Sequence, residues 1–413
     1  MTMRSYTKTL YETLGRDPVH PFPARMAPGI ALTAMAEAEA PICVLDPMMG
    51  SGTVLALARA EGHRAIGVDI DPLAVLISRV WTTTVDQDEA RDKAREVLDR
   101  ACTRFKGIPS GEAYPPNADE ETRSFSRYWF DPYARRQLAA LSETISLVRN
   151  DTIRDVLWCG LSRLIITKQA GACLALDLSH SRPHKKFTVA PEKPFRKFLA
   201  AVERVIVNCV SSNDRERGPV ARALSGDARK LPVESRTVDL VLTSPPYLNA
   251  IDYLRCSKFS LIWMGHSIPD LRQLRADSIG TERGMAAEED KKAELVIRDL
   301  RLRPRLSSRH EAILRRYVVD MRASVREVAR VLKKDGRALY VVGENTIKGT
   351  FVRNAAVVIV AAESAGLRLK KRQSRALPAN RRYLPPPETR DKDAALDSRM
   401  RREVVLEFQR CAA

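Results

Sequence analysis

Near the N-terminus, short runs of hydrophobic residues alternate with a segment whose hydrophobic residues have helical spacing. An apolar run at residues 42–45 leads into the glycine-rich stretch Asp46-Pro-Met-Met-Gly-Ser-Gly-Thr53, and residues 54–60 continue as a helix. Residues 65–69 then form a second short strand that ends in an acid, Asp69. This order of strand, turn, helix and strand predicts the opening of a doubly wound parallel α/β sheet.

A long stretch of helical periodicity, residues 86–214, interrupts the predicted sheet. Asp131, followed by Pro132, and Asp151 each predict the start of a helix. A sheet domain rarely carries so long a connection without structure of its own, so we expect a helical insertion. A further helix after Pro194 places an apolar set on one face, namely Phe195, Phe198, Leu199, Val202, Val205 and Ile206.

The sheet resumes after this insertion, with strands expected near 223–227, 238–243, 337–342 and 403–408 and a helix at 352–365. A capping box, Ser308-Arg-His-Glu311, predicts a helix that ends at Gly336 as its C-cap glycine. Residues 270–307 are charged and aperiodic, which indicates a mobile loop or a recognition element. The predicted segments are therefore 1–85, 86–214 and 215–413, with a charged insertion at about 270–307.

The net charge of the chain indicates a class of binding partner. Lys and Arg exceed Asp and Glu by 69 − 51 = 18 in 413 residues, with a pI near 9.8. Such a balance favours a polyanion such as nucleic acid. Seven cysteines without a Cys-x-x-Cys pair indicate reduced, buried thiols. The chain starts without an apolar leader, and its longest apolar run, 355–362, is too short to cross a bilayer, so we expect a cytoplasmic protein without membrane insertion.

The glycine-rich stretch identifies a class of cofactor. Leu55 stands where a dinucleotide fingerprint has its third glycine, and no Gly-Lys-Ser/Thr follows, so neither NAD nor ATP is expected. A tight turn at a helix N-terminus favours a carboxylate, Asp46 favours an ammonium, and Asp69 at a strand end favours ribose hydroxyls. S-adenosylmethionine carries all three groups. No metal site is predicted, because His180 and His184 have no acid or cysteine at suitable spacing.

The tetrad Ser244-Pro245-Pro246-Tyr247 ends the strand at 238–243. Two prolines fix φ and remove two amide donors, which leaves carbonyl acceptors at a strand end where α/β sheets bind ligands. An aromatic amine becomes nucleophilic only when its hydrogens are held, and Ser244 Oγ and the Pro245 carbonyl are suitable acceptors. Tyr247 is suited to stack on a base that has been flipped out of a duplex.

In this order, the motifs resemble those of the amino-group DNA methyltransferases, which methylate cytosine N4 or adenine N6. The resemblance implies a Rossmann-like, mostly parallel methyltransferase sheet with a helical insertion, and S-adenosylmethionine as cofactor. It also implies that residues 20–26 lie beside the methionine end of the cofactor. It implies cofactor contacts for Asp46, Pro47, Gly50, Gly52, Thr53, Asp69 and Asp227, the last to adenine, and catalytic roles for Ser244, Pro245, Pro246 and Tyr247.

Several alternatives stay open. Serine at the start of the tetrad favours cytosine N4 over adenine N6, and the absence of a Pro-Cys dipeptide disfavours attack on cytosine C5. Double-stranded DNA is the expected partner, and an accompanying restriction endonuclease is a candidate second partner. An RNA base-amine methyltransferase and a non-catalytic nucleic-acid-binding relative are the competing functions.

The chain departs from the family pattern at two places. Met49 replaces a usual phenylalanine, which keeps an apolar contact beneath the cofactor. The insertion separates Asp69 from Asp227 and is the candidate region for target recognition. Its nucleic-acid features are the basic loop 179–186 and the set Arg123, Arg127, Tyr128, Trp129 and Phe130, for which a packed core is the alternative reading.

Overall fold

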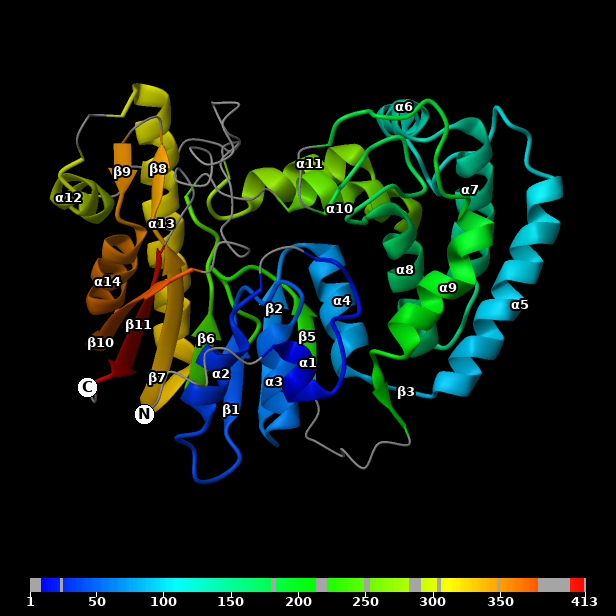
Figure 1. Ribbon diagram of the computed structural model, residues 1–413. Coiled ribbons are helices and arrows are strands. Elements are labelled where there is room, and N and C mark those ends of the chain that lie inside the picture. Colours follow the sequence, from blue (N-terminus) through cyan, green and yellow to red (C-terminus); the bar gives the residue numbers. More distant parts are fainter. Residues whose placement is uncertain are drawn as a thin grey trace. The chain divides into compact units, whose positions relative to one another are not determined.

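The computed structural model describes residues 9–22, 25–179, 183–212, 221–248, 253–281, 291–302, 306–347, 350–377 and 402–411. Seven strands form its main sheet, in the hydrogen-bonded order β10-β11-β7-β6-β1-β2-β5 (Figure 1). The pairs β1/β6, β6/β7 and β2/β5 are parallel, whereas β11 runs antiparallel to both neighbours. The α/β class with a mostly parallel sheet is confirmed. The strands are β1 (Cys43–Asp46), β2 (Arg64–Asp69), β5 (Ala221–Ser225), β6 (Val238–Thr243), β7 (Leu332–Gly343), β10 (Leu367–Ala376) and β11 (Arg402–Arg410).

The direction of chain progression through the sheet reverses at β1. The chain runs from β1 to β2 and β5 and then resumes at β6, on the other flank of β1. Val44 pairs with Leu240 and Leu45 with Val241, so β1 and β6 end at the same edge. Open α/β sheets bind ligands beyond the strand ends at such a reversal. The ends of β1 and β6 are therefore the place to look for a site.

The described chain forms two compact units. The first comprises residues 1–33, 49–225 and 252–275, and the second 34–48, 226–251 and 276–413. Two helices have residues in both, α2 (Pro28–Met35) and α11 (Ile268–Asp277). The segments predicted with boundaries at 85/86 and 214/215 stay a prediction.

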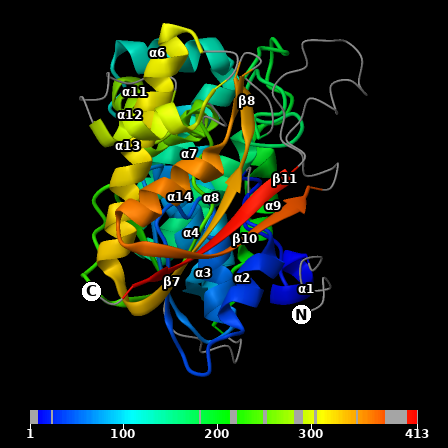
Figure 2. The same ribbon diagram turned by 90° about the vertical axis from the view of Figure 1, so that its left-hand side faces the viewer.

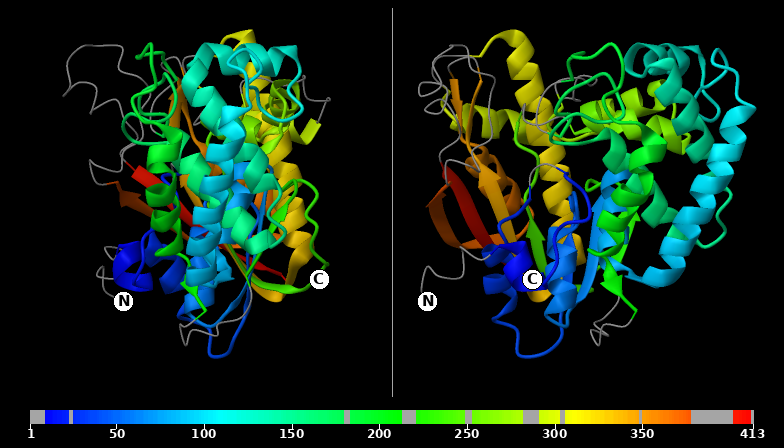
Figure 3. Two further views of the ribbon diagram at one scale, coloured as in Figure 1. Left: turned by 90° about the vertical axis from the view of Figure 1, so that its right-hand side faces the viewer. Right: turned by 45° about the vertical axis from the view of Figure 1, so that its right-hand side comes forward.

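The first unit is mainly helical and contains the predicted insertion, which is confirmed as the helices α5 to α9 (Figure 3). Phe130, Phe198, Phe259 and Trp263 are all fully buried in its core, and the Phe130 and Trp263 rings meet edge to face at 5.4 Å. Two of these aromatic residues come from residues 254–264, so this later segment completes the core of the insertion. The unit contains α1 (Leu10–Leu14), α3 (Thr53–Ala60), α4 (Pro72–Thr82), β3 (Thr84–Val85), α5 (Gln87–Lys106), α6 (Glu120–Trp129), α7 (Pro132–Ser146), α8 (Asp151–Ile165), α9 (Pro194–Ile206), β4 (Val210–Ser211), α10 (Leu254–Leu261) and a 3-10 turn, η2 (Ile262–Met264).

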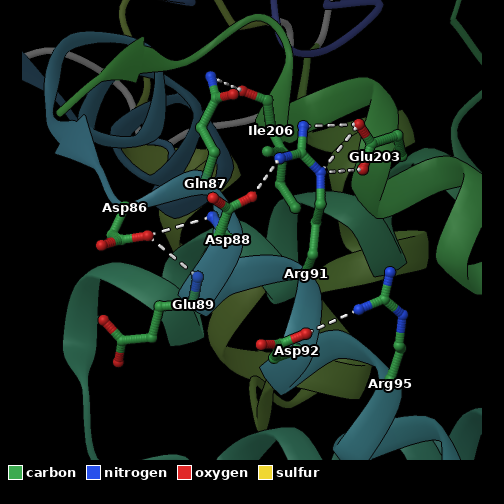
Figure 4. Close-up of polar contacts among 9 residues, drawn as sticks. All are labelled: Asp86, Gln87, Asp88, Glu89, Arg91, Asp92, Arg95, Glu203 and Ile206. Atoms are coloured by element: carbon green, nitrogen blue, oxygen red, sulfur yellow. Dashed lines mark hydrogen bonds and ion pairs between the residues drawn. The ribbon is translucent and has the colours of Figure 1, made fainter. Parts of the chain in front are cut away.

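Polar contacts tie α5 to α9 at the surface (Figure 4). Asp86 caps α5 by accepting from the amides of Asp88 and Glu89. The Arg91 guanidinium donates to Glu203 of α9 at 2.9–3.2 Å. Gln87 Nε2 donates to the carbonyl at the end of α9. These half-exposed pairs contribute little free energy each, and the packed apolar face of α9 carries most of the stability.

The second unit packs helices on the sheet (Figure 2). The helix α14 lies against α13 and covers β7, β10 and β11. Tyr317, Tyr340 and Phe408 are buried there, with the last two rings meeting edge to face at 5.9 Å. Of the sheet strands, β2 and β5 belong to the first unit and the other five to the second. The described part of the second unit also contains α12 (Lys291–Asp299), α13 (Ser308–Val331), β8 (Asn345–Ile347), β9 (Thr350–Val352) and α14 (Asn354–Ser364).

The predicted C-cap at Gly336 is wrong. Helix α13 ends at Val331, and Leu332 is already extended and paired with Val238 of β6. Gly336 lies within β7, where an added Cβ would be 3.0 Å from the Lys333 carbonyl oxygen. The glycine therefore serves a close approach of backbone in a strand, which the helical pattern before it does not reveal.

The predicted helix starts are partly wrong. Asp131 caps α7 as expected, but α8 is capped by Asn150 and not by Asp151. At α13 the N-cap is Ser307, whose hydroxyl contacts His310 Nδ1 at 2.7 Å, so the capping box from Ser308 is wrong. Short polar residues in series each suit a cap, and the backbone conformation selects one of them.

Three further expectations need correction. The charged stretch 270–307 is not a loop throughout, because α11 and α12 lie in it, although 282–290 and 303–305 are outside the described residues. Leu199 of α9 is 38% exposed and not on the buried face. The seven cysteines are not all buried, because Cys102 and Cys411 are exposed.

Candidate active site

The glycine turn after β1 requires glycine at two positions. Gly50 and Gly52 have φ values of 50° and 80°. A Cβ on Gly52 would lie 2.6 Å from Ser78 Oγ, and that hydroxyl donates to the Gly50 carbonyl at 2.9 Å. Glycine provides both the left-handed backbone and the space. The turn is thus held against α4 and delivers the chain to the N-terminus of α3.

The N-terminus of α3 is suited to an anionic group. The first turn of the helix holds no acidic residue. Thr53 Oγ1 is buried and has no hydrogen-bond partner among the described residues. Free amides and the helix dipole favour negative charge at such an end. A carboxylate is therefore a suitable ligand for this turn.

Asp69, the predicted ribose acid, is joined to the glycine turn. Its Oδ2 accepts from the Gly50 amide at 2.9 Å and its Oδ1 accepts from the Asp71 amide at 2.9 Å. Burial raises the pKa of Asp69, and the backbone hydrogen bonds oppose that rise. Each carboxylate oxygen retains acceptor capacity for a hydroxyl. The structure thus brings Gly50 and Asp69 together, as the proposed contact with one ligand requires.

Asp71 belongs to the same cluster and was missed in the sequence. It caps α4 by accepting from the Leu73 amide, and its Oδ2 accepts from Ser257 Oγ at 2.8 Å. Burial, together with the negative charge of Asp69, raises the pKa of Asp71 to about 7. The available signal was an aspartate before a proline at a helix start. The partner Ser257 is far away in sequence and gave no signal.

Two residues of the segment 20–26, Phe22 and Arg25, contact the glycine turn, whereas residues 23 and 24 lie outside the described residues. Arg25 Nε donates to Ser51 Oγ at 3.3 Å, and a Cβ on Gly50 would lie 3.5 Å from Phe22. The Phe22 ring stacks on Tyr253 at 5.4 Å. His20 is buried, and its pKa is lowered well below the usual value, chiefly by burial. Phe22 therefore brings an apolar ring to the turn, and Arg25 brings a cationic group.

Met49, which replaces the usual phenylalanine, is 4% exposed. A Cβ on Gly67 of β2 would lie 2.4 Å from its sulfur. The thioether thus packs directly on the strand backbone. Gly67 makes room for this packing, and the apolar contact beneath the cofactor stays a prediction.

In the second unit, Asp46 and the tetrad end the neighbouring strands β1 and β6. Asp46 is 4% exposed and its Oδ1 accepts from the Met48 amide at 3.1 Å. Pro47 is also buried. The structure thus places the predicted ammonium-binding acid and the predicted catalytic motif at one edge of the sheet.

The hydroxyl of Ser244 is oriented by its neighbour strand. Ser244 Oγ donates to the Val341 carbonyl at 3.1 Å. Since a hydroxyl has a single hydrogen, its lone pairs are left to accept. Ser244 is partly exposed and Pro245 is buried. The serine is therefore preorganised as an acceptor, as the proposed role requires.

An asparagine relay, also missed in the sequence, supports the chain after the tetrad. Asn345 Nδ2 donates to the Leu248 carbonyl, and Asn354 Nδ2 donates to Asn345 Oδ1 at 3.0 Å. Asn354 is fully buried at the start of α14. The only signal for Asn345 was its position just after a buried strand. Burial raises the pKa of the adjoining Glu344.

Asp227, the predicted adenine acid, lies in the second unit and is held by Arg229. The Arg229 guanidinium contacts both Asp227 oxygens at 2.6–3.0 Å and donates to Asp320 Oδ1 at 2.7 Å. The Asp227 side chain is 34% exposed. Its carboxylate is therefore fixed in orientation and open to solvent.

The aromatic set of the insertion divides between core and surface. Phe130 is fully buried and Trp129 packs on the core, but Tyr128 is 55% exposed with Lys185 Nζ 4.8 Å from its ring centre. The core reading holds for the first two, and Tyr128 with Lys185 presents a ring and a cation to solvent. Residues 180–182 of the basic loop lie outside the described residues.

No group of three or more His, Cys, Asp or Glu side chains among the described residues is arranged to hold a metal ion. No helix in the described part of the chain has the length and apolar character needed to cross a membrane.

Known proteins with a similar sequence share one activity. The chain is 23% identical over 370 residues to Type II methyltransferase M.MvaI of Kocuria varians, covering 80% of this chain and 77% of that protein. The chain is similar to Type II methyltransferases. It is 24% identical over 342 residues to M.AvaI of Anabaena variabilis, covering 73% and 68% of the two chains. Its match to M.BsoBI of Geobacillus stearothermophilus, 23% over 258 residues, spans 49% of that protein. No protein-family model matches the chain.

Solved structures give weaker likenesses. A methyltransferase dependent on S-adenosylmethionine from Methanosarcina mazei has a TM-score of 0.32 at 8% identity, over 92% of this chain and 98% of that one. A TehB-like enzyme from Corynebacterium glutamicum has a TM-score of 0.29 at 9% identity, over 92% and 86%.

Proposed function

We propose that this chain transfers a methyl group from S-adenosylmethionine to the exocyclic amine of a flipped base in DNA. Cytosine N4 is favoured over adenine N6. The observation that carries the proposal is the Ser244 hydroxyl, whose hydrogen is donated to the Val341 carbonyl so that its oxygen is an acceptor at the end of β6. Similarity to Type II methyltransferases over most of the chain supports the same activity.

The residues of the first unit fit the cofactor. The α3 N-terminus, with the partnerless hydroxyl of Thr53, suits its carboxylate, and Asp69 suits its ribose hydroxyls. Gly50 and Gly52 let the backbone approach because no Cβ intervenes. When bound, S-adenosylmethionine supplies a methyl group on a sulfonium centre.

The residues of the second unit act on the base. Ser244 Oγ and the Pro245 carbonyl accept hydrogen bonds from the two amine hydrogens, which shifts the nitrogen toward tetrahedral geometry and exposes its lone pair. The nitrogen releases one of these protons to water when it takes up the methyl group. Pro246 and Tyr247 complete the conformationally restricted tetrad, and the Tyr247 ring stacks on the base. Asp46 stabilises the cofactor ammonium, and Asp227 accepts from its adenine amine. Rate enhancement then comes mainly from positioning and preorganised electrostatics.

The direct test is product analysis. Protein, labelled S-adenosylmethionine and either double-stranded DNA or RNA are incubated, and the digested nucleosides are identified by mass spectrometry. N4-methylcytosine in DNA is the expected product. N6-methyladenine would change the base, label in RNA alone would change the substrate, and no label with intact cofactor binding would favour a non-catalytic relative. An accompanying restriction endonuclease is tested separately, by co-purification.

A further inference from the structure

We propose that Arg229 is a positioning residue that fixes the Asp227 carboxylate for the cofactor adenine and links it to the backbone beside Tyr247. This inference rests on the proposed function. No motif of the sequence singles out Arg229, because its partners lie up to 91 positions away. All residues involved belong to the second unit.

The contact between Arg229 and Asp227 is a fork on a carboxylate. Nε lies 3.0 Å from each carboxylate oxygen, and Nη2 lies 2.6 Å from Oδ2. The Arg229 amide also donates to Oδ1 at 2.8 Å. A planar guanidinium that meets both oxygens permits a single orientation of the carboxylate. Asp227 is 34% exposed at its side chain, so another face of the carboxylate remains available to an amine donor.

The other end of the guanidinium is anchored in the protein. Nη1 donates to Asp320 Oδ1 at 2.7 Å, and Asp320 on α13 has only 8% of its side chain exposed. Arg316, one turn earlier on that helix, contacts Asp320 Oδ2 at 3.5 Å. Two arginines thus balance two aspartates. Although burial opposes its charge, hydrogen bonds to the aspartates raise the pKa of Arg229.

A third contact of Arg229 reaches the support of the catalytic tetrad. Nη2 donates to the Asp277 carbonyl at 2.8 Å, where helix α11 ends. Three residues later, a Cβ on Gly280 would lie 3.0 Å from the Tyr247 carbonyl oxygen and 3.8 Å from Pro246. The turn after α11 therefore packs on the tetrad backbone. The Arg229 guanidinium therefore hydrogen-bonds both to the start of this turn and to the Asp227 carboxylate.

The test measures the choice between two cofactors by calorimetry. S-adenosylmethionine is compared with its analogue in which hypoxanthine replaces adenine, which lacks the exocyclic amine that Asp227 would accept. The wild type should bind the adenine form more tightly by about tenfold or more, since a hydrogen bond to a charged group is involved. Arg229→Ala should weaken the binding of S-adenosylmethionine and bring the ratio of the two dissociation constants close to one.

The ratio separates positioning from general damage. A purely structural loss would weaken both ligands equally and leave the ratio unchanged, which would overturn the inference. Arg229→Lys keeps the charge but cannot make the fork, so it should lower the ratio as well. Arg330→Ala is the matched control, because Arg330 makes comparable bonds to Glu327 and to the Leu231 and Val233 carbonyls without touching Asp227.

A double-mutant cycle confirms the route. If Arg229 acts through Asp227, adding Arg229→Ala to Asp227→Asn should change the affinity by less than Arg229→Ala does alone. Additive effects would contradict the proposal. Should Arg229→Ala not fold, Asp320→Asn removes the charge of the anchor while both residues of the fork remain, and the ratio should again fall. A wild type that does not bind S-adenosylmethionine would instead refute the proposed function.

Discussion

Single hydrogen bonds assign roles at the residue scale, and Ser244 is the main example. Its hydroxyl hydrogen is directed to the Val341 carbonyl, so its lone pairs are left to accept. This orientation suits the proposed role as an acceptor from a base amine. A carbonyl on a neighbouring strand determines it.

Ser244→Ala should lower kcat by on the order of 100-fold, the usual loss for one preorganised polar group, while the dissociation constant of S-adenosylmethionine stays the same. Methyl transfer to DNA and calorimetry measure the two quantities. Ser364→Ala is the control, because Ser364 Oγ also donates to a backbone carbonyl of the same unit, that of Val360. Transfer by Ser244→Ala near the wild-type rate would exclude the acceptor role.

Asp71 is the residue whose charge state should influence stability. Its pKa in the folded protein is raised to about 7, mainly by burial, above the usual 3.8 of the free side chain. The folded state thus holds the proton more tightly than the unfolded state between these values. Its contribution to stability is fully present below about pH 4 and is lost as pH rises to about 7.

Asp71→Asn should remove this pH dependence, since asparagine caps a helix as well as aspartate and carries no charge. The variant and the wild type should be equally stable near pH 4. At pH 8 the variant should be more stable by a few kcal/mol at most, since one pKa unit corresponds to about 1.4 kcal/mol. Urea denaturation across pH measures the difference. Asp86→Asn, at the exposed cap of α5, should keep the wild-type profile.

At the scale of elements, helix α3 is flanked on both sides by a glycine with a left-handed backbone conformation. Gly52 precedes the helix with φ 80° and Gly62 follows it with φ 81°. An added Cβ would meet Ser78 at the first position and nothing within 4 Å at the second. The two ends thus share one backbone requirement and differ in packing.

Gly52→Ala and Gly62→Ala should each lose about 1–2 kcal/mol of unfolding free energy for the left-handed backbone. Gly52→Ala should lose roughly 1–3 kcal/mol more, because the methyl group overlaps Ser78. Gly52→Ala should also weaken the binding of S-adenosylmethionine, whereas Gly62→Ala should not. Denaturation and calorimetry measure both. Equal losses in the two variants would show that the close approach at Gly52 is unimportant.

At the scale of the whole molecule, the net charge of +18 predicts binding to DNA that weakens steeply with salt. Replacing Lys185 and Lys186 together by glutamine should reduce the slope of log K against log salt by about 1–2 if they contact phosphates. Replacing Lys370 and Lys371 of β10 removes the same charge elsewhere and is the control. An identical change in both variants would indicate net charge alone and no contact at residues 185–186.

Patterns local in sequence predicted most of the fold. Residue type indicates which side chains must be buried. Examples are the apolar run at 42–45, the alternation around 238–243 and the apolar face of α9. The same logic placed Asp46, Asp69 and Ser244 at strand ends. It failed at Gly336 and Ser308, where a glycine and a serine satisfy several local conformations and neighbouring strands or backbone geometry select one.

The sequence by itself determined the α/β class, the glycine turn with its acid, and the tetrad with the chemistry that it suits, because each depends on residues adjacent in the chain. The tertiary structure alone decided how these groups are oriented. The Gly50 amide on Asp69, the Val341 carbonyl on Ser244, Ser257 on Asp71 and Arg229 on Asp227 are all contacts of the folded chain. Most of these contacts join residues far apart in the chain. Hydrogen bonds of this kind depend on distances that only folding sets, so no local pattern encodes them.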